Sequence, residues 1–273
     1  MSAGGGGEGD VRLVVNGAVA TVTLDRPATL NAQTPATWRA LREIGRSLPP
    51  DVYLVIVRGQ GRAFSSGLDR RLFTPEGLPG SPSMLQIARM ASDDANILLA
   101  EYQEAFSWLS STDRVSIAAV HGPAIGAGFQ LALACDLRVL ADDAVLCMAE
   151  TTLGLVPDLG GVQSLVSLVG SGRALEMCLT GRRIGATEAL QVGLANLVVP
   201  TAELSAAVDD LVAALLVPPP AAVVETKALI SGAAGRTRAQ QLAAERAAQL
   251  RRLRDLTDSS RAAPPVADPL EDH

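Results

Sequence analysis

Two short glycine-bearing turns constrain this chain more than any other feature of its sequence. The turns 64–69 (FSSGLD) and 121–128 (HGPAIGAG) each come after an apolar run typical of a buried strand, 52–57 and 115–120 respectively. Small residues let backbone N–H groups face a pocket without obstruction by side chains. The second turn continues directly into a helical sequence, so its free amides should lie at a helix N-terminus, where an anion is favoured. Two such donors can stabilise one oxyanion, which suits a reaction that forms an enolate.

Composition excludes several classes of protein. The chain has 273 residues, 48% of them hydrophobic, which is enough for one large domain with an appendage. Its net charge is −6 and its basic residues are scattered, so we expect no nucleic-acid partner. No apolar run reaches transmembrane length, and residues 1–10 lack the pattern of a signal peptide. We therefore expect no membrane association and a cytoplasmic location. With two histidines, and three cysteines at spacings unlike those of zinc sites, no metal site is expected.

The order of predicted elements indicates an α/β fold. Two β-rich runs, 11–15 and 19–24, flank Asn16-Gly17, which is typical of a tight hairpin. Strands and helices then alternate, which favours a largely parallel sheet. Further helices are expected at 34–48, 94–109, 164–169 and 173–179, the last two divided by glycines 170 and 172, and further strands at 137–140 and 145–148. We expect a flexible N-terminus at 1–10, a core domain at 11–200, a helical region at 201–260, and a disordered tail at 261–273.

Four motifs in this order resemble those of the enoyl-CoA hydratase/isomerase, or crotonase, superfamily, and the similarity extends from about residue 11 to 256. They are 24–32 (LDRPATLNA), which resembles a loop that contacts coenzyme A, 63–69 and 121–136, which resemble the two oxyanion segments, and 150–161, which resembles the catalytic loop. The resemblance implies a repeated ββα spiral core, a C-terminal helical region for oligomerisation, and homotrimers or dimers of trimers. It also implies an acyl-CoA thioester substrate, with coenzyme A arriving as part of the substrate and no permanently bound cofactor.

The resemblance assigns roles to individual residues. The oxyanion donors would be the backbone N–H groups of Leu68 and Ala127, provided that φ of Ala127 is negative. An alternative is that the glycine turns only allow strands to meet helices. The residues expected to contact coenzyme A or the substrate are Arg26, Ala28, Leu30, Ser66, Asp69 and Gly126.

Three side chains are candidates for proton transfer. Glu150 occupies the position of the family's retained catalytic glutamate, whereas Gln130 stands where hydratases of the family usually carry a second glutamate. A glutamine orients water but exchanges no proton near neutral pH. Asp158, eight residues after Glu150, gives a spacing similar to that of dienoyl-CoA isomerases, and burial should raise the pKa of both carboxyl groups. Alternatively, Asp158 caps the helix that begins near Gly161, and Gln130 is only a buried polar residue.

These residues favour an enzyme over a binding protein. The leading hypothesis is enoyl- or dienoyl-CoA isomerisation, with an enolate held by two backbone amides and protons moved by carboxylates. The first alternative is hydration of a 2-enoyl-CoA to a 3-hydroxyacyl-CoA, and the second is a non-catalytic acyl-CoA-binding protein. Serine hydrolysis through Ser65 or Ser66 lacks the G-x-S-x-G motif, and the structural position of His121 in its turn leaves no suitable base. The sequence does not define the acyl chain.

Overall fold

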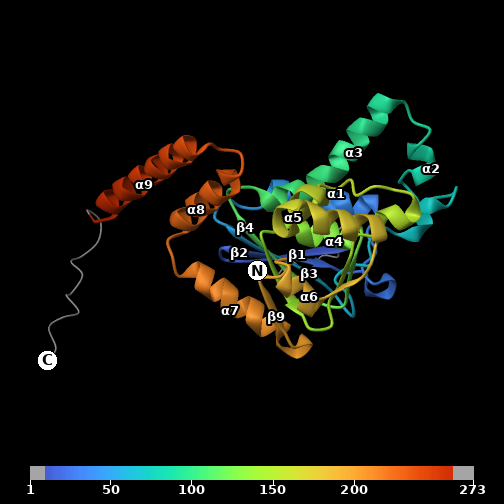
Figure 1. Ribbon diagram of the computed structural model, residues 1–273, viewed down its shortest axis with the longest axis horizontal. Helices are drawn as coiled ribbons and strands as arrows, with labels where there is room; N and C mark the ends of the chain where they lie inside the picture. The colour runs from blue at the N-terminus through green and yellow to red at the C-terminus, as the bar shows by residue number, and fades with distance from the viewer. Residues whose placement is uncertain (1–9, 261–273) are drawn as a thin grey trace. The chain divides into compact units, whose positions relative to one another are not determined.

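The computed structural model describes the backbone of residues 10–260 and the side chains of residues 10–257. These residues divide into two compact units, 10–214 and 215–260. Figure 1 shows the first unit in colours from blue to orange and the second in darker orange and red. The division lies inside a helix, so it differs from the predicted boundary after residue 200. The predicted flexible terminus, apart from Asp10, and the predicted tail lie outside the described residues.

A six-stranded sheet forms the centre of the first unit, in the order β1-β2-β3-β4-β6-β9. The strands are β1 (Val11–Asn16), β2 (Val19–Leu24), β3 (Leu54–Gly59), β4 (Val115–Val120), β6 (Leu137–Ala141) and β9 (Leu197–Val199). The β1–β2 pair is antiparallel and turns at Gly17, whose φ of 55° suits glycine. Every other pair in this sheet is parallel. The predicted hairpin and parallel sheet are confirmed.

A second, three-stranded sheet contains β5 (Pro123–Ile125), β7 (Val145–Cys147) and β8 (Ile184–Gly185). The strand β5 pairs with β7 in parallel, and β7 pairs with β8 antiparallel. Along the chain, β4, β5 and α4 (Ala127–Ala134) form one strand–strand–helix unit, and β6, β7 and α5 (Gly161–Thr180) form the next. An isolated parallel bridge between Ser65 and Ala124 extends the small sheet toward the chain that follows β3. This arrangement agrees with the expected repeated ββα core.

The helices of the first unit begin where the sequence provides caps or turns. α1 (Pro35–Ser47) has a capping box between Thr34 and Thr37, and it buries Trp38 against Tyr102 of α3 (Ser92–Ser107), with ring centroids 4.7 Å apart. α5 is broken at Gly170, which has φ 77° and ψ 161°, so the predicted division is confirmed although the helix starts earlier than expected. The remaining elements are α2 (Met84–Ile87), α6 (Ala186–Gln191), α7 (Leu204–Leu216), and the 3₁₀ turns η1 (Pro27–Thr29), η2 (Arg70–Phe73), η3 (Trp108–Ser110), η4 (Glu150–Leu153) and η5 (Thr201–Glu203).

The second unit consists of α8 (Pro220–Ala233) and α9 (Arg238–Ser260), which pack against each other. The Glu225 carboxylate of α8 accepts hydrogen bonds from the Arg251 guanidinium of α9 at 3.0 and 2.8 Å. The apolar side chains of Ile230, Leu253 and Leu256 are exposed within this unit. Its predicted role in oligomerisation stays a prediction. No single described helix is long and apolar enough to cross a membrane, and α7 and α8 reach that criterion only when counted together across their break.

Candidate active site

The two glycine-bearing turns lie side by side and are joined by backbone hydrogen bonds. The N–H of Phe64 donates to the carbonyl of His121 at 2.8 Å, and the N–H of Ser65 donates to the carbonyl of Pro123 at 2.9 Å. In return, the N–H of Ile125 donates to the carbonyl of Ser65 at 3.0 Å. The turns therefore form one short parallel ladder, and their ends are fixed relative to each other.

Glycine is required where the turns approach most closely. A Cβ on Gly67, whose φ is 88°, would lie 2.5 Å from the carbonyl oxygen of Ile125 and 3.6 Å from the nitrogen of Ala127. A Cβ on Gly128 would lie 2.5 Å from the carbonyl oxygen of Ser65. Both distances of 2.5 Å are shorter than a carbon and an oxygen tolerate, so any side chain at either position would push the two turns apart.

The backbone directs the amides of Leu68 and Ala127 away from other protein groups. The N–H of Gln33 donates to the carbonyl of Gly67 at 2.7 Å, and the N–H of Asp69 donates to the carbonyl of Gln33 at 2.8 Å. In an extended chain, successive residues present their N–H groups to opposite sides, so Leu68 faces away from Gln33. Within residues 10–260, neither the Leu68 amide nor the Ala127 amide donates to another protein group. Ala127 opens α4 with a φ that is not positive, so its methyl group adds no backbone strain.

Glu150 lies beside the second of these amides. It begins η4 directly after the small sheet, and it is 8% exposed. A Cβ on Gly126, the residue before α4, would lie 3.3 Å from Glu150 Oε1. That oxygen accepts a hydrogen bond of 2.7 Å from Gln130 Nε2, whereas Oε2 is buried and has no partner among the described residues. One carboxylate oxygen is thus held in place, and the other is available for a ligand.

Gln130 links this glutamate to the loop that carries Asp158. Its side chain is 1% exposed, and its Oε1 accepts hydrogen bonds from the N–H groups of Leu159 at 2.9 Å and Gly161 at 3.3 Å. Two backbone donors at Oε1 leave only one orientation for the amide, with Nε2 directed at Glu150. Gln130 is buried, as the alternative has it, and its side chain also joins Glu150 to the backbone of the loop that follows Asp158.

Burial governs the electrostatics of both carboxyl groups. Desolvation raises the pKa of Glu150, the hydrogen bond from Gln130 lowers it, and the charge of Asp158 raises it. Partial burial raises the pKa of Asp158 as well. The direction expected from the sequence is confirmed for both groups. The N-cap of α5 is Gly160, and the N–H of Gly161 donates to Gln130 rather than to the Asp158 carboxyl group, so the alternative that Asp158 caps this helix is wrong.

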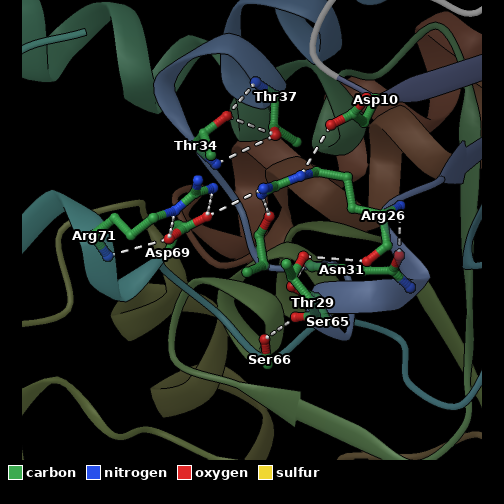
Figure 2. Close-up of polar contacts among 11 residues, drawn as sticks. Asp10, Arg26, Thr29, Asn31, Thr34, Thr37, Ser65, Ser66, Asp69 and Arg71 are labelled. Atoms are coloured by element: carbon green, nitrogen blue, oxygen red, sulfur yellow. Dashed lines mark hydrogen bonds and ion pairs between the residues drawn. The ribbon is translucent and has the colours of Figure 1, made fainter. Parts of the chain in front are cut away.

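Arg26 and Asp69 are already engaged with protein groups (Figure 2). The Arg26 guanidinium pairs with Asp69 and contacts the backbone, so it does not lie free for a phosphate. Hydrogen bonds from Arg71, and to a smaller extent from Arg26, lower the pKa of the Asp69 carboxyl group to about 2, although burial opposes this shift. Ala28 is exposed, Leu30 is half-buried, and Ser66 Oγ donates to the carbonyl of Thr29 at 3.0 Å. A role of these residues in binding coenzyme A stays a prediction.

A buried polar network that the sequence analysis missed supports the first turn. Trp38 Nε1 donates to Gln33 Oε1 at 2.8 Å, and Gln33 Nε2 donates to Ser65 Oγ at 3.2 Å. Ser65 Oγ in turn donates to the carbonyl of Asn31 at 2.8 Å and accepts from the N–H of Gly67 at 3.2 Å. Ser65 is fully buried in this network, which gives it no role as a nucleophile. In the sequence, the polar residues Asn31 and Gln33 before α1 are the feature that could have indicated this network.

Comparison with known proteins agrees with this geometry. The family model for enoyl-CoA hydratase/isomerase matches residues 15–259. A protein of Thermobifida fusca YX assigned as an enoyl-CoA hydratase has been solved with CoA, at 49% identity and a TM-score of 0.87 over 92% of this chain and 95% of that one. The same protein with acetoacetyl-CoA gives 50% identity and a TM-score of 0.86, over 90% and 96% of the two chains.

Curated relatives include both named activities of the family. YngF of Bacillus subtilis, assigned as an enoyl-CoA hydratase/isomerase, is 33% identical over 80% of each chain. The peroxisomal Δ(3,5)-Δ(2,4)-dienoyl-CoA isomerase of Arabidopsis thaliana is 31% identical over 81% of this chain and 80% of that protein. The described residues contain no cluster of three or more His, Cys, Asp or Glu side chains suited to a metal ion. With the crotonase fold and these matches, the chain belongs to the enoyl-CoA hydratase/isomerase family and is an enzyme of that family.

Proposed function

We propose that this protein isomerises a carbon–carbon double bond in an enoyl- or dienoyl-CoA thioester. The thioester carbonyl oxygen accepts hydrogen bonds from the N–H groups of Leu68 and Ala127. Glu150 Oε2 removes a proton from the acyl chain, which places negative charge on that oxygen as an enolate. Return of a proton to another carbon of the conjugated system moves the double bond and regenerates the carboxylate. The reaction consumes no water and needs no metal or redox cofactor.

The observation that carries this proposal is the hydrogen bond of 2.7 Å between Gln130 Nε2 and Glu150 Oε1. The Gln130 amide does not exchange a proton near neutral pH, and the buried Asp69 is paired with two arginines, so among the described residues Glu150 is the candidate beside the Ala127 amide for proton transfer. The raised pKa of Glu150 makes its carboxylate a stronger base than an ordinary glutamate, and it keeps more of the acid form present near neutral pH. One group can thus remove a proton and return it at a second carbon.

The substrate class is supported by the solved relatives. The T. fusca protein, about half identical to this chain, holds CoA in one structure and acetoacetyl-CoA in another. Acetoacetyl-CoA is a thioester whose enolate is readily formed, which makes it a suitable ligand for a pair of oxyanion donors. Among curated relatives, two named dienoyl-CoA isomerases from Arabidopsis thaliana and Rattus norvegicus match this chain.

Hydration of a 2-enoyl-CoA is the second candidate, and the position of Asp158 favours it. Asp158 is exposed, its charge acts on Glu150, and its side chain is not used as a helix cap. A carboxylate with a raised pKa at this position can hold the attacking water while Glu150 supplies the proton. The two reactions differ by one solvent oxygen in the product.

The test incubates the purified protein with 2-enoyl-, 3-enoyl- and 3,5-dienoyl-CoA thioesters in heavy-oxygen water and weighs the products by mass spectrometry. A shifted double bond without mass gain, abolished by Glu150→Gln but not by Glu203→Gln, supports isomerisation. Glu203 lies exposed in η5 and controls for loss of a carboxylate. Incorporation of one heavy oxygen would establish hydration instead. Tight binding of every thioester without turnover would indicate an acyl-CoA-binding protein.

A further inference from the structure

Arg26 cross-links three segments of the chain from a nearly buried position. Its side chain is 14% exposed, and each of its three guanidinium nitrogens has its own partner (Figure 2). Nε pairs with Asp10 Oδ2 at 2.9 Å, Nη1 donates to the carbonyl of Ala32 at 2.5 Å, and Nη2 pairs with Asp69 Oδ2 at 3.1 Å. The planar guanidinium suits this role, because it presents donors in several fixed directions at once.

Asp69 connects Arg26 to the first glycine-bearing turn, residues 64–69. It directly follows Leu68, its side chain is 7% exposed, and its N–H donates to the carbonyl of Gln33 at 2.8 Å. Arg71 binds both oxygens of the carboxylate, with Nε 3.0 Å from Oδ1 and Nη2 2.8 Å from Oδ2, the oxygen that Arg26 also contacts. The residue after the Leu68 amide is therefore held by its backbone and by its side chain.

The loop between Arg26 and Gln33 is strained and needs such support. Leu30 and Asn31 both have positive φ, 54° and 55°, a conformation that residues other than glycine seldom adopt. The N–H of Arg26 donates to Asn31 Oδ1 at 2.9 Å, and Asn31 Nδ2 donates to the carbonyl of Ala63 at 2.7 Å. The carbonyl of Leu30 accepts from the N–H of Ser66 at 2.8 Å. Strain of this kind persists only where surrounding contacts hold it.

We infer that Arg26 is a positioning residue for the reaction: through Asp69 and the carbonyl of Ala32, it fixes the direction of the Leu68 N–H that stabilises the enolate. This inference rests on the proposed function, because it assigns the Leu68 amide to an oxyanion. It replaces the expected contact of Arg26 with coenzyme A by an indirect role. Removing the guanidinium should turn the amide away from the enolate while leaving the coenzyme A contacts of other residues in place.

The inference is tested with acetoacetyl-CoA, whose bound enolate absorbs in the ultraviolet. The absorbance of the complex is titrated against pH for the wild type, Arg26→Lys, Asp69→Asn and the double variant, and CoA affinity is measured by calorimetry. Lysine keeps the charge but offers one nitrogen for three partners. The control is Arg12→Gln, which removes an arginine from an exposed pair with Asp25, 3.7 Å apart on the same hairpin.

A weakened oxyanion site raises the pH at which the bound ligand ionises. We expect about a 10- to 100-fold weaker preference for the enolate in Arg26→Lys, a similar fall in kcat, and a CoA dissociation constant within about twofold of wild type. The double variant should be no worse than the more affected single variant, since both act through one contact. Arg12→Gln should match the wild type.

Two other results would overturn the inference. An unchanged enolate titration with weaker, salt-dependent CoA binding in Arg26→Lys and Asp69→Asn would make Arg26 a phosphate contact after all. A wild-type protein that binds acetoacetyl-CoA without any enolate signal would overturn the proposed function together with the inference. If Arg26→Lys does not fold, Asp69→Asn decides alone, because its side chain keeps the same shape and can still accept from one arginine.

Discussion

Replacing Gln130 with glutamate is the sharpest test of how the site handles protons. Gln130 Oε1 accepts from two backbone N–H groups, so the corresponding oxygen of a glutamate would keep those partners. The second oxygen would then face Glu150 Oε1 at the present donor distance of 2.7 Å, with no hydrogen between them. Gln130→Glu therefore converts a charge-assisted hydrogen bond into a contact between two acceptors.

The energies decide what the variant does. Two unit charges at 2.7 Å repel by about 6 kcal/mol at an effective dielectric constant of about 20. Protonating one ordinary carboxylate at pH 7 costs about 3 to 4 kcal/mol, at about 1.4 kcal/mol per pKa unit. The repulsion exceeds the cost of protonation, so the pair should take up one proton and share it. The backbone N–H groups of Leu159 and Gly161 stabilise the charged form of the new carboxylate at position 130. The shared proton should therefore lie mainly on Glu150, so that less of its carboxylate form is present at pH 7.

The assay is the rate of double-bond isomerisation across the pH range, with heavy-oxygen incorporation followed in parallel. Gln130→Glu should move the acid limb of kcat to higher pH and lower the rate at pH 7 by at least about tenfold. Gln163→Glu is the matched control, since Gln163 is exposed on α5. An acid limb in Gln130→Glu that coincides with the wild type would refute the reasoning. Oxygen incorporation appearing only in the variant would show that the amide excludes hydration.

Three further outcomes follow from the same geometry. Glu150→Gln should raise the free energy of unfolding at pH 7, because burial raises the folded-state pKa and the charged form is disfavoured. In denaturant titrations this advantage should shrink as pH falls through the raised folded-state pKa and vanish below the unfolded-state pKa, and a gain that persists in acid would contradict it. Gly126→Ala adds a methyl group 3.3 Å from Glu150 Oε1 at a φ of 51°, and it should lose about tenfold or more in kcat. Gly80→Ala, with φ 71° and open space around it, should show backbone strain alone and leave kcat unchanged. Asn31→Ala removes three side-chain hydrogen bonds and should cost about 2 to 4 kcal/mol in thermal or denaturant unfolding, whereas a loss below about 1 kcal/mol would show the strained loop to be held otherwise.

Local signals predicted the fold well. The Asn16-Gly17 hairpin, the helix expected at 34–48 and the apolar strand β4 each depend on a few adjacent residues, and all three are confirmed. The assignment of Glu150 depended on the family resemblance, and the raised direction of its pKa was expected from burial in the loop 150–161. Element types and buried strands are thus accessible to pattern and propensity alone.

Contacts between distant segments were not predictable. Arg26 is expected from the sequence to contact coenzyme A or the substrate, but its partners at Asp10, Ala32 and Asp69 come from three parts of the chain. The hydrogen bonds that join Gln33 to Trp38 and to Ser65 were likewise not predicted, and the second joins segments that are far apart in the sequence. Sequence patterns give burial and local geometry, whereas side-chain partners depend on how elements meet after folding. Polar residues with several donors are therefore the hardest to assign in advance.

The ladder that joins the two turns has a consequence for folding. The N–H of Phe64 bonds to His121, and that of Ile125 bonds to Ser65, so each half of the site is held by a segment far away in the sequence. Pairing between distant segments forms slowly, because closing a long loop costs chain entropy before the stabilising hydrogen bonds are made. Refolding should therefore restore helical signal before it restores ligand binding. We therefore expect catalytic competence to arise late in folding, at the step that closes the chain between β3 and β4.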